Sequence, residues 1–213
     1  MVDQIKAVVF DMDGVLIEAK EWHFEALNRA LGLFGCPISR DDHINYFDGL
    51  PTATKLEMLS SQGRFPRKLH SFINELKQKY TIELVHAHCK PRFDHEYALS
   101  KLKLDGYKIG CASNSITNSI NTMLSKSNLI QYMDKIVSAQ DVDLPKPAPD
   151  IYLKAFSELG VAPNECLVLE DNENGIKAAN DSGANLLVVK EVNEVNYENI
   201  ISEISRIEIE DSH

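Results

Sequence analysis

The pattern of apolar and polar positions along this chain begins with a predicted buried strand. The segment KAVVFDMDGVL at positions 6–16 contains an unbroken run of β-branched and aromatic residues, which is typical of a strand buried on both faces. Asp11 and Asp13 end this run, and a glycine that relaxes the turn follows them. Two carboxylates two positions apart are a poor structural end for a strand, but they suit a nucleophile placed beside a metal ion.

The next seventy or so residues repeat apolar positions at helical spacing, and clusters of Gly and Pro separate the repeats. We predict a helix over 20–35, a short helix capped by Ser39 and reaching Phe47, a helix capped by Thr52 and reaching Ser61, and a longer fourth helix. Residues 17–89 are therefore expected to form a small helical domain inserted into a larger one. The buried faces of the first and last of these helices are predicted to carry His23, Leu27, Ala30, Leu31 and Phe34, and Leu69, Phe72, Ile73, Leu76 and Tyr80.

From position 94 onwards, strand and helix patterns alternate. This alternation predicts an α/β fold, a doubly wound parallel sheet with helices on both faces, built from residues 1–16 and 90–213. The tail from Asn193 is weakly helical and acidic in its pattern. The predicted strands are 107–112, 136–139, 166–169 and 185–189, and the predicted helices 94–105, 119–124, 150–160 and 174–182.

Composition narrows the class of function. The chain has 213 residues and a net charge of −10, which argues against a nucleic-acid or anionic-membrane surface but leaves a phosphorylated small molecule open if a cation inverts the local field. No signal-peptide, transmembrane or lipidation pattern is evident, so we expect a cytoplasmic protein, either a monomer or a weak homo-oligomer. The cysteines are expected to be reduced and buried, and they are Cys36, Cys89, Cys111 and Cys166.

Chemistry-bearing residues follow the predicted strands. In a doubly wound sheet, sites form at the carboxyl ends of strands, and those ends carry Asp11, Ser113-Asn114, the loop through Lys146, and Glu170-Asp171. Carboxylates, a hydroxyl and an ammonium together supply what phosphoryl transfer through an aspartyl-phosphate requires. Taken singly, each residue has a plainer interpretation, as a turn, a solvated loop lysine or a helix cap.

Four segments, in order, resemble the four motifs of the haloacid-dehalogenase-like hydrolase superfamily: DMDGVL, ASNS, LPKPAPDIY and LVLEDNENGI. The helical insertion after the first motif resembles the cap of the subfamily that includes β-phosphoglucomutase and phosphoglycolate phosphatase. The resemblance implies a Rossmann-like core, a cap that closes over substrate, and a Mg²⁺-dependent reaction on a small phosphorylated metabolite, with a sugar phosphate as the first guess.

The resemblance also implies a role for each motif residue. Asp11 would be the nucleophile and a Mg²⁺ ligand, and Asp13 the general acid/base, with its backbone carbonyl on the metal. Lys146 would neutralise Asp11 and the phosphoryl group. Ser113 and Asn114 would bind the phosphoryl group, while Asp171 would ligate Mg²⁺ and Glu170 would either ligate it or lie beside its ligands.

Residues of the predicted cap differ from those of the mutase members. The turn Gly49-Leu50-Pro51-Thr52 lacks the Arg that grips a second phosphate in those proteins, so we expect hydrolysis, with a sugar-phosphate mutase as the alternative. Gly49 and Thr52 remain expected substrate contacts. His23 is either a packing residue or a substrate or proton-relay group. A metal site at His86, His88 and Cys89 is disfavoured, because the sequence offers no second ligand pair at matching spacing.

Overall fold

The computed structural model describes residues 4–47 and 50–210, and within them one parallel sheet of five strands. Its strand order is β3-β2-β1-β4-β5, so the first strand of the chain lies at the centre, between β2 and β4. The strands are β1 (Ala7–Phe10), β2 (Lys108–Ser113), β3 (Lys135–Ser138), β4 (Cys166–Glu170) and β5 (Asn185–Val188).

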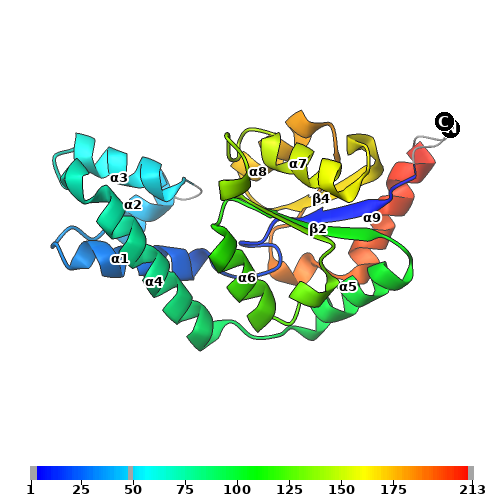
Figure 1. The fold of residues 1–213 in the computed structure, drawn as a ribbon, viewed down its shortest axis with the longest axis horizontal. Helices are drawn as coiled ribbons and strands as arrows, with labels where there is room; N and C mark the ends of the chain where they lie inside the picture. Colours follow the sequence, from blue (N-terminus) through cyan, green and yellow to red (C-terminus); the bar gives the residue numbers. More distant parts are fainter. Residues whose placement is uncertain (1–3, 48–49, 211–213) are drawn as a thin grey trace. The chain divides into compact units, whose positions relative to one another are not determined.

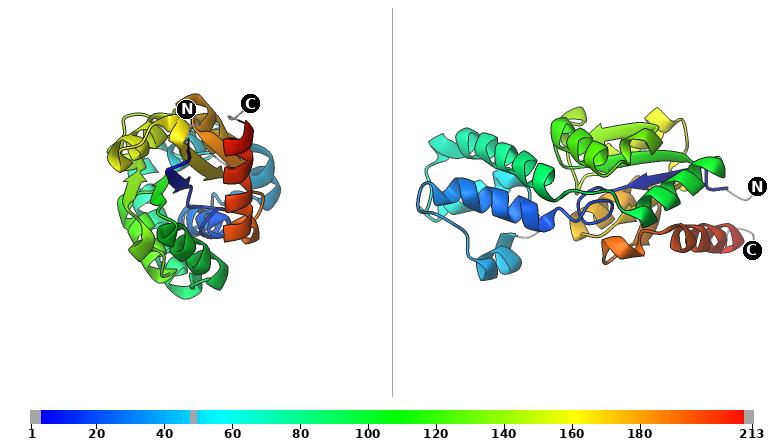
Figure 2. Two further views of the ribbon diagram at one scale, coloured as in Figure 1. Left: turned by 90° about the vertical axis from the view of Figure 1, so that its right-hand side faces the viewer. Right: turned by 90° about the horizontal axis from the view of Figure 1, so that it is seen from below.

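Helices cover both faces of this sheet. In Figure 1, α7 and α8 lie on one face, and α5, α6 and α9 lie on the other. Figure 2 shows α9 beside the strands it covers. The predicted doubly wound α/β fold is confirmed. The bounds of these helices are α5 (Phe93–Leu104), α6 (Thr117–Lys126), α7 (Asp150–Leu159), α8 (Glu173–Ser182) and α9 (Tyr197–Glu210).

The central strands explain the position of the core. Every residue of β1 and β4 is buried, as expected for parallel strands covered on both faces. One face packs against the apolar side of α7, where Ile151, Tyr152, Ala155, Phe156 and Leu159 form one cluster with strand residues. Gly160 ends α7 in the left-handed conformation, with φ of 66°, as its place after the apolar stripe predicts.

The chain divides into two compact units, Met1–Glu18 with Cys89–His213, and Ala19–His88. The second unit is helical, and its α1 packs along α4 around a core that includes Leu27, Leu31 and Ile73. The sequence predicts a helical insertion at 17–89, and the helical unit of the structure spans 19–88. Its helices are α1 (Lys20–Gly32), α2 (Arg40–Asp42), α3 (Thr52–Ser61) and α4 (His70–His88), with a π-helical turn at His43–Phe47.

Several helix details differ from prediction, while the Ser39 cap is confirmed because its hydroxyl accepts from the Asp42 N–H at 3.0 Å. Thr52 is the first residue of α3 and not its cap, since Pro51 occupies the cap position and no side chain caps the helix. Phe34 and Phe72 are 40% and 45% exposed, not buried, and their rings meet edge to face.

Two further expectations need adjustment. All four cysteines are free, as predicted, but Cys36 is half-buried where the sequence suggested burial. The weakly helical tail contains the regular helix α9, since Ile200, Ile204 and Ile207 recur at helical spacing and are buried. None of the helices in the described part of the chain has the length and apolar character needed to cross a bilayer. Single helical turns occur at Arg67–Leu69, Ile130–Tyr132, Ala139–Asp141, Pro163–Glu165 and Val192–Glu194.

Candidate active site

The ends of three neighbouring strands bring the predicted site residues together. Parallel registers place Phe10 opposite both Cys111 and Leu169, so Asp11 follows β1 at the level where β2 and β4 end. Ser113 is the last residue of β2 and Glu170 the last of β4. The carboxyl edge of the sheet therefore gathers residues from the first, second and fourth motifs, as the topology predicts.

The second carboxylate of the first motif lies in a tight turn that follows Asp11. The Asp11 N–H donates to the Leu169 carbonyl at 3.0 Å, which continues the sheet through Asp11. Gly14 then adopts φ of 98°, a conformation that L side chains rarely adopt, and its N–H donates to the Ile17 carbonyl at 2.7 Å. Asp11 is buried, at 4% exposure, while Asp13 is half-buried.

Lys146 reaches the centre of this edge from the loop before α7. Its Nζ donates to Oδ1 of Asp11 at 2.6 Å, to Oε1 of Glu170 at 2.6 Å and to the Ala112 carbonyl at 2.8 Å. An ammonium has three protons, so these contacts use all of them. The lysine is 3% exposed, and the plainer interpretation as a solvated loop lysine is therefore wrong.

Asn114 holds the backbone of that lysine. Its Nδ2 donates to the Lys146 carbonyl at 3.1 Å, and its Oδ1 accepts from the Lys146 N–H at 3.0 Å. Sequence reasoning placed Asn114 beside the phosphoryl group, and the structure shows that its side-chain amide is engaged with the Lys146 loop. Ser113 is buried at the end of β2, and its Oγ accepts from the Ser115 N–H at 3.1 Å.

Glu170 is fully buried and has a donor on every side. Besides Lys146, the Tyr152 hydroxyl donates to Oε1 at 2.6 Å, while the Asp171 N–H and the Asn172 Nδ2 donate to Oε2 at 3.0 and 3.2 Å. Gly175 on α8 makes room for this carboxylate, because a Cβ there would lie 1.8 Å from Oε1 of Glu170.

Helix α8, which begins within the fourth motif, is capped by Asn172. The plainer interpretation of Glu170 and Asp171 as its cap is wrong, because Asn172 caps the helix and accepts from the Gly175 N–H at 3.1 Å. Its Nδ2 also donates to Glu170. One asparagine thus ties the start of α8 to the buried carboxylate.

Burial and neighbouring charges shift the pKa values of the site residues. Desolvation raises the pKa of Asp11 well above its usual value, the charge of Glu170 raises it further, and Lys146 opposes both. Burial alone would lower the pKa of Lys146, but the Asp11 and Glu170 carboxylates outweigh it and hold that pKa above its ordinary value. Burial also raises the pKa of Tyr152, so its hydroxyl keeps the proton that it donates.

The donor set fits a hard divalent cation. Carboxylate oxygens of Asp11, Glu170 and Asp171 lie within 4.8 Å of one another, and the Lys146 ammonium donates to the two that are buried, Asp11 and Glu170. Carboxylate oxygens are the ligands that Mg²⁺ prefers, and a cation would relieve the excess negative charge. Across residues 4–47 and 50–210, this is the single such group of His, Cys, Asp and Glu, so His86, His88 and Cys89 do not form one.

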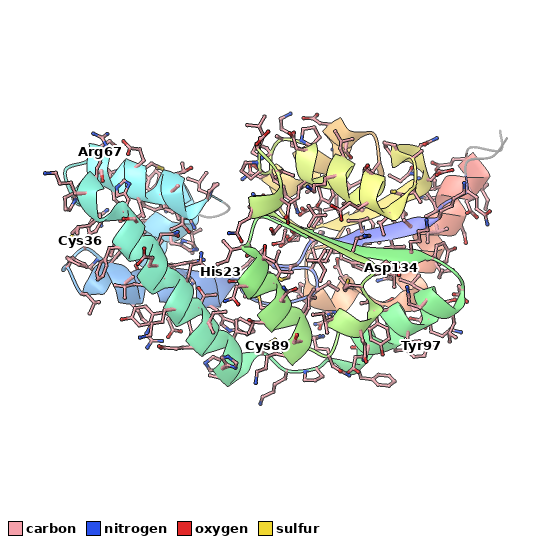
Figure 3. The ribbon with its side chains drawn as sticks, viewed as in Figure 1. His23, Cys36, Arg67, Cys89, Tyr97 and Asp134 are labelled. Carbon is pink, nitrogen blue, oxygen red and sulfur yellow. The ribbon has the colours of Figure 1, made fainter. Side chains whose placement is uncertain are left out.

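The predicted site residues of the helical unit have different surroundings. His23 lies on α1 (Figure 3), and its Nδ1 is 3.1 Å from Nζ of the buried Lys77 on α4. His23 is thus hydrogen-bonded within its own unit and half-buried. Thr52 is half-buried at the start of α3, and Gly49 lies outside the described residues.

Sequence reasoning missed two polar side chains at the sheet edge. The Ser115 hydroxyl donates to Oδ2 of Asp13 at 2.8 Å, and Tyr152 contacts Glu170 from α7. Ser115 lies within the ASNS segment, two positions beyond Ser113. For Tyr152 the available signal was a hydroxyl on the apolar face of a helix, where a buried polar group requires a partner.

Comparisons with known proteins identify relatives of this chain. A family model described as haloacid dehalogenase-like hydrolase matches residues 8–189. A phosphorylated carbohydrates phosphatase of Thermotoga maritima is 31% identical over 185 residues, covering 84% of this chain and 82% of that protein. The β-phosphoglucomutase of Bacillus subtilis is 30% identical over 195 residues, covering 84% and 80%.

Solved structures show the same fold. A β-phosphoglucomutase crystal structure from Clostridium difficile superposes with a TM-score of 0.81 at 24% identity, covering 97% of this chain and 100% of that one. The resemblance that the four motifs predicted is confirmed by the family match and by the identity to the two relatives. The chain belongs to the haloacid dehalogenase-like hydrolase family.

Proposed function

We propose that this protein is a Mg²⁺-dependent phosphatase that hydrolyses a small phosphorylated metabolite, with a sugar phosphate as the favoured class, through an aspartyl-phosphate on Asp11. The observation that carries the proposal is the convergence of Asp11, Glu170 and Asp171 within 4.8 Å, with Nζ of Lys146 at 2.6 Å from Asp11. A buried carboxylate held by an ammonium and placed beside further acids is suited to attack on phosphorus.

In the first step, Asp11 attacks the phosphorus of the ester. Lys146 binds its Oδ1, so we assign the attack to Oδ2. The new bond forms between Oδ2 and phosphorus, while the bond from phosphorus to the ester oxygen breaks and its electron pair stays on that oxygen. Asp13, protonated at this stage, gives its proton to the departing oxygen as a general acid.

In the second step, Asp13 acts in the opposite direction. It takes a proton from a water molecule, whose oxygen attacks phosphorus, and the bond from phosphorus to Oδ2 of Asp11 breaks to restore the carboxylate and release phosphate. The Ser115 hydroxyl, at 2.8 Å from Oδ2 of Asp13, orients this carboxyl group. Ser113 at the end of β2 is assigned to the phosphoryl oxygens, as the motif resemblance implies.

The carboxylates of Asp11 and Asp171, with the backbone carbonyl of Asp13, are assigned as the groups that hold Mg²⁺. When bound, the cation would screen the repulsion between Asp11 and the phosphate and stabilise charge that develops on the phosphoryl oxygens. The excess of buried carboxylates over ammonium groups supports this assignment.

The substrate class is inferred from relatives and from one sequence departure. The relative from Thermotoga maritima is named a phosphorylated carbohydrates phosphatase, which favours a phosphorylated sugar. The identity to the β-phosphoglucomutase of Bacillus subtilis keeps a sugar-phosphate mutase as the second candidate. Hydrolysis is favoured over the mutase because the segment at 49–52 contains no Arg for a distal phosphate.

A substrate screen tests this proposal. Purified protein is incubated with phosphorylated sugars, nucleotides and small acids, with Mg²⁺ or with EDTA, and free phosphate is measured. We expect phosphate release from at least one sugar phosphate, abolished by EDTA. Isomer formation that exceeds phosphate release and depends on a sugar bisphosphate would favour the mutase. No Mg²⁺-dependent turnover across the panel would contradict both enzymes.

A further inference from the structure

Tyr152 is a polar residue in an otherwise apolar layer. It is fully buried on α7, and its ring stacks on Phe156 with centroids 6.3 Å apart. Its hydroxyl reaches the sheet edge, where it donates to Oε1 of Glu170 at 2.6 Å. A buried hydroxyl is costly unless it is bonded, and a phenylalanine would fill the same apolar space. The hydroxyl is therefore best explained by what it does to Glu170.

The hydrogen bonds of Glu170 account for its whole accepting capacity. An ionised carboxylate offers about four acceptor positions, two on each oxygen. Lys146 and Tyr152 share Oε1, and the Asp171 N–H and Asn172 Nδ2 share Oε2. Glu170 nevertheless has an oxygen within 4.8 Å of oxygens of Asp11 and Asp171. The distance between this oxygen of Glu170 and those of Asp11 and Asp171 suits a metal ligand. The hydrogen bonds of Glu170, however, leave no acceptor position for a cation.

Tyr152 also contacts Lys146 directly. The Nζ of Lys146 lies 4.6 Å from the centroid of the Tyr152 ring, within the range of a cation–π contact. The same nitrogen donates to Asp11, Glu170 and the Ala112 carbonyl. One tyrosine thus touches both the ammonium and the carboxylate that flank the proposed nucleophile.

We propose that Tyr152 is a positioning residue, whose hydroxyl shares Oε1 of Glu170 with Lys146 and so keeps Glu170 from coordinating the cation. This inference rests on the proposed function, and it divides the three clustered acids into two roles. Asp11 and Asp171 hold the cation, and Glu170 holds the lysine that binds Asp11. Without the hydroxyl, Oε1 of Glu170 gains an open acceptor position.

Tyr152→Phe tests this assignment of separate roles to the three acids, because it changes the shape of the side chain little. The ring and its contacts with Phe156 and Lys146 remain, and the hydroxyl alone is lost. An added anionic oxygen strengthens cation binding, whereas a displaced Glu170 weakens its hold on Lys146 and slows the chemistry. The variant should therefore bind Mg²⁺ more tightly and turn over more slowly, two changes that simple loss of stability would not produce together.

The experiment has two measurements. Mg²⁺ alone is titrated into the full chain by calorimetry, and kcat and KM are measured on the best substrate of the screen. We expect Tyr152→Phe to bind Mg²⁺ more tightly than wild type and to lose about tenfold in kcat, with a smaller change in KM. Phe156→Leu is the matched control, because it disturbs the same helix and core but leaves the hydrogen bonds of Glu170 in place, and both quantities should stay near wild type.

A second background shows whether the hydroxyl acts through Glu170. In Glu170→Gln, the anionic oxygen is gone, so adding Tyr152→Phe should not tighten Mg²⁺ binding further. Wild-type or weaker affinity in Tyr152→Phe overturns the proposal, and so does equal tightening in the Glu170→Gln background. Because the titration needs no substrate, its failure is distinct from a failure of the proposed function, which is a wild type that binds Mg²⁺ but releases no phosphate.

Discussion

The Nζ of Lys146 lies 2.6 Å from Oδ1 of Asp11, across 135 positions of sequence. Both side chains are buried, with 3% and 6% of their surface exposed. The fold therefore places a cation on the proposed nucleophile before any substrate arrives. Glu170 accepts from the same ammonium, and its side chain has no exposed surface.

Loss of the ammonium should damage stability and turnover together. Lys146→Met leaves Asp11 and Glu170 buried without their cation, and breaking a buried ion pair on one side costs about 3–5 kcal/mol. Unfolding in urea measures this cost. Lys177→Met is the control, because its ion pair with Asp181 is exposed and such pairs contribute about 0–1 kcal/mol. Equal stability of the two variants would contradict the buried pairing.

A methyl group beneath Glu170 should be tolerated poorly. In Gly175→Ala the new Cβ would lie 1.8 Å from Oε1 of Glu170, so the carboxylate or α8 must move, and overpacking of this kind costs about 1–3 kcal/mol. Phosphate release should fall with it. Gly32→Ala at the end of α1 is the matched control, since nothing lies within 4 Å of its Cβ position. Wild-type stability and turnover in Gly175→Ala would show that Glu170 is not fixed in place.

The Ser115 hydroxyl should affect turnover most for substrates whose leaving oxygen must be protonated by Asp13. Ser115→Ala removes the hydroxyl that orients Asp13, so proton donation to the leaving oxygen weakens. We expect kcat/KM for an alkyl phosphate to fall about tenfold, and for p-nitrophenyl phosphate, whose leaving group needs little protonation, by less than about twofold. Ser125→Ala, on the exposed side of α6, should leave both unchanged. An equal fall for both esters would argue against this role.

His95 makes stability depend on pH. Its ring lies between the Leu16 and Val192 carbonyls, and burial lowers its pKa below the ordinary value of 6.5. Between the folded and unfolded pKa values the unfolded chain binds more protons, so the free energy of unfolding falls as pH drops below about 6.5. Urea unfolding at several pH values measures the slope, and His95→Gln should remove part of it. An unchanged slope in that variant would contradict the assignment.

Much of this arrangement could be predicted because it depends on local pattern. Strand ends follow from apolar runs that stop at polar residues, and parallel alternation alone places Asp11, Ser113 and Glu170 at one edge. The cap by Ser39 follows from its spacing to Asp42. The four motifs added the family, which the comparisons confirm.

The remainder depends on contacts between distant segments. Asn114 bonds the backbone of Lys146, and Tyr152 bonds Glu170, neither of which a local pattern can show. Tyr97 on α5 (Figure 3) is 41% exposed, and its ring meets that of Tyr197 on α9 edge to face. The local pattern of α5 does not show this contact either. A helical stripe indicates which side of a helix faces inward, but which polar groups meet there is decided by tertiary structure.

The most direct test of the account is phosphate release by Asp11→Asn beside Asp181→Asn, an exposed aspartate on α8. Asparagine keeps the shape of Asp11 but removes the anionic oxygen that attacks phosphorus. With folding confirmed by circular dichroism, we expect Asp11→Asn to lose at least about a thousandfold in kcat and Asp181→Asn to match wild type. Turnover by Asp11→Asn within about tenfold of wild type would contradict Asp11 as the nucleophile.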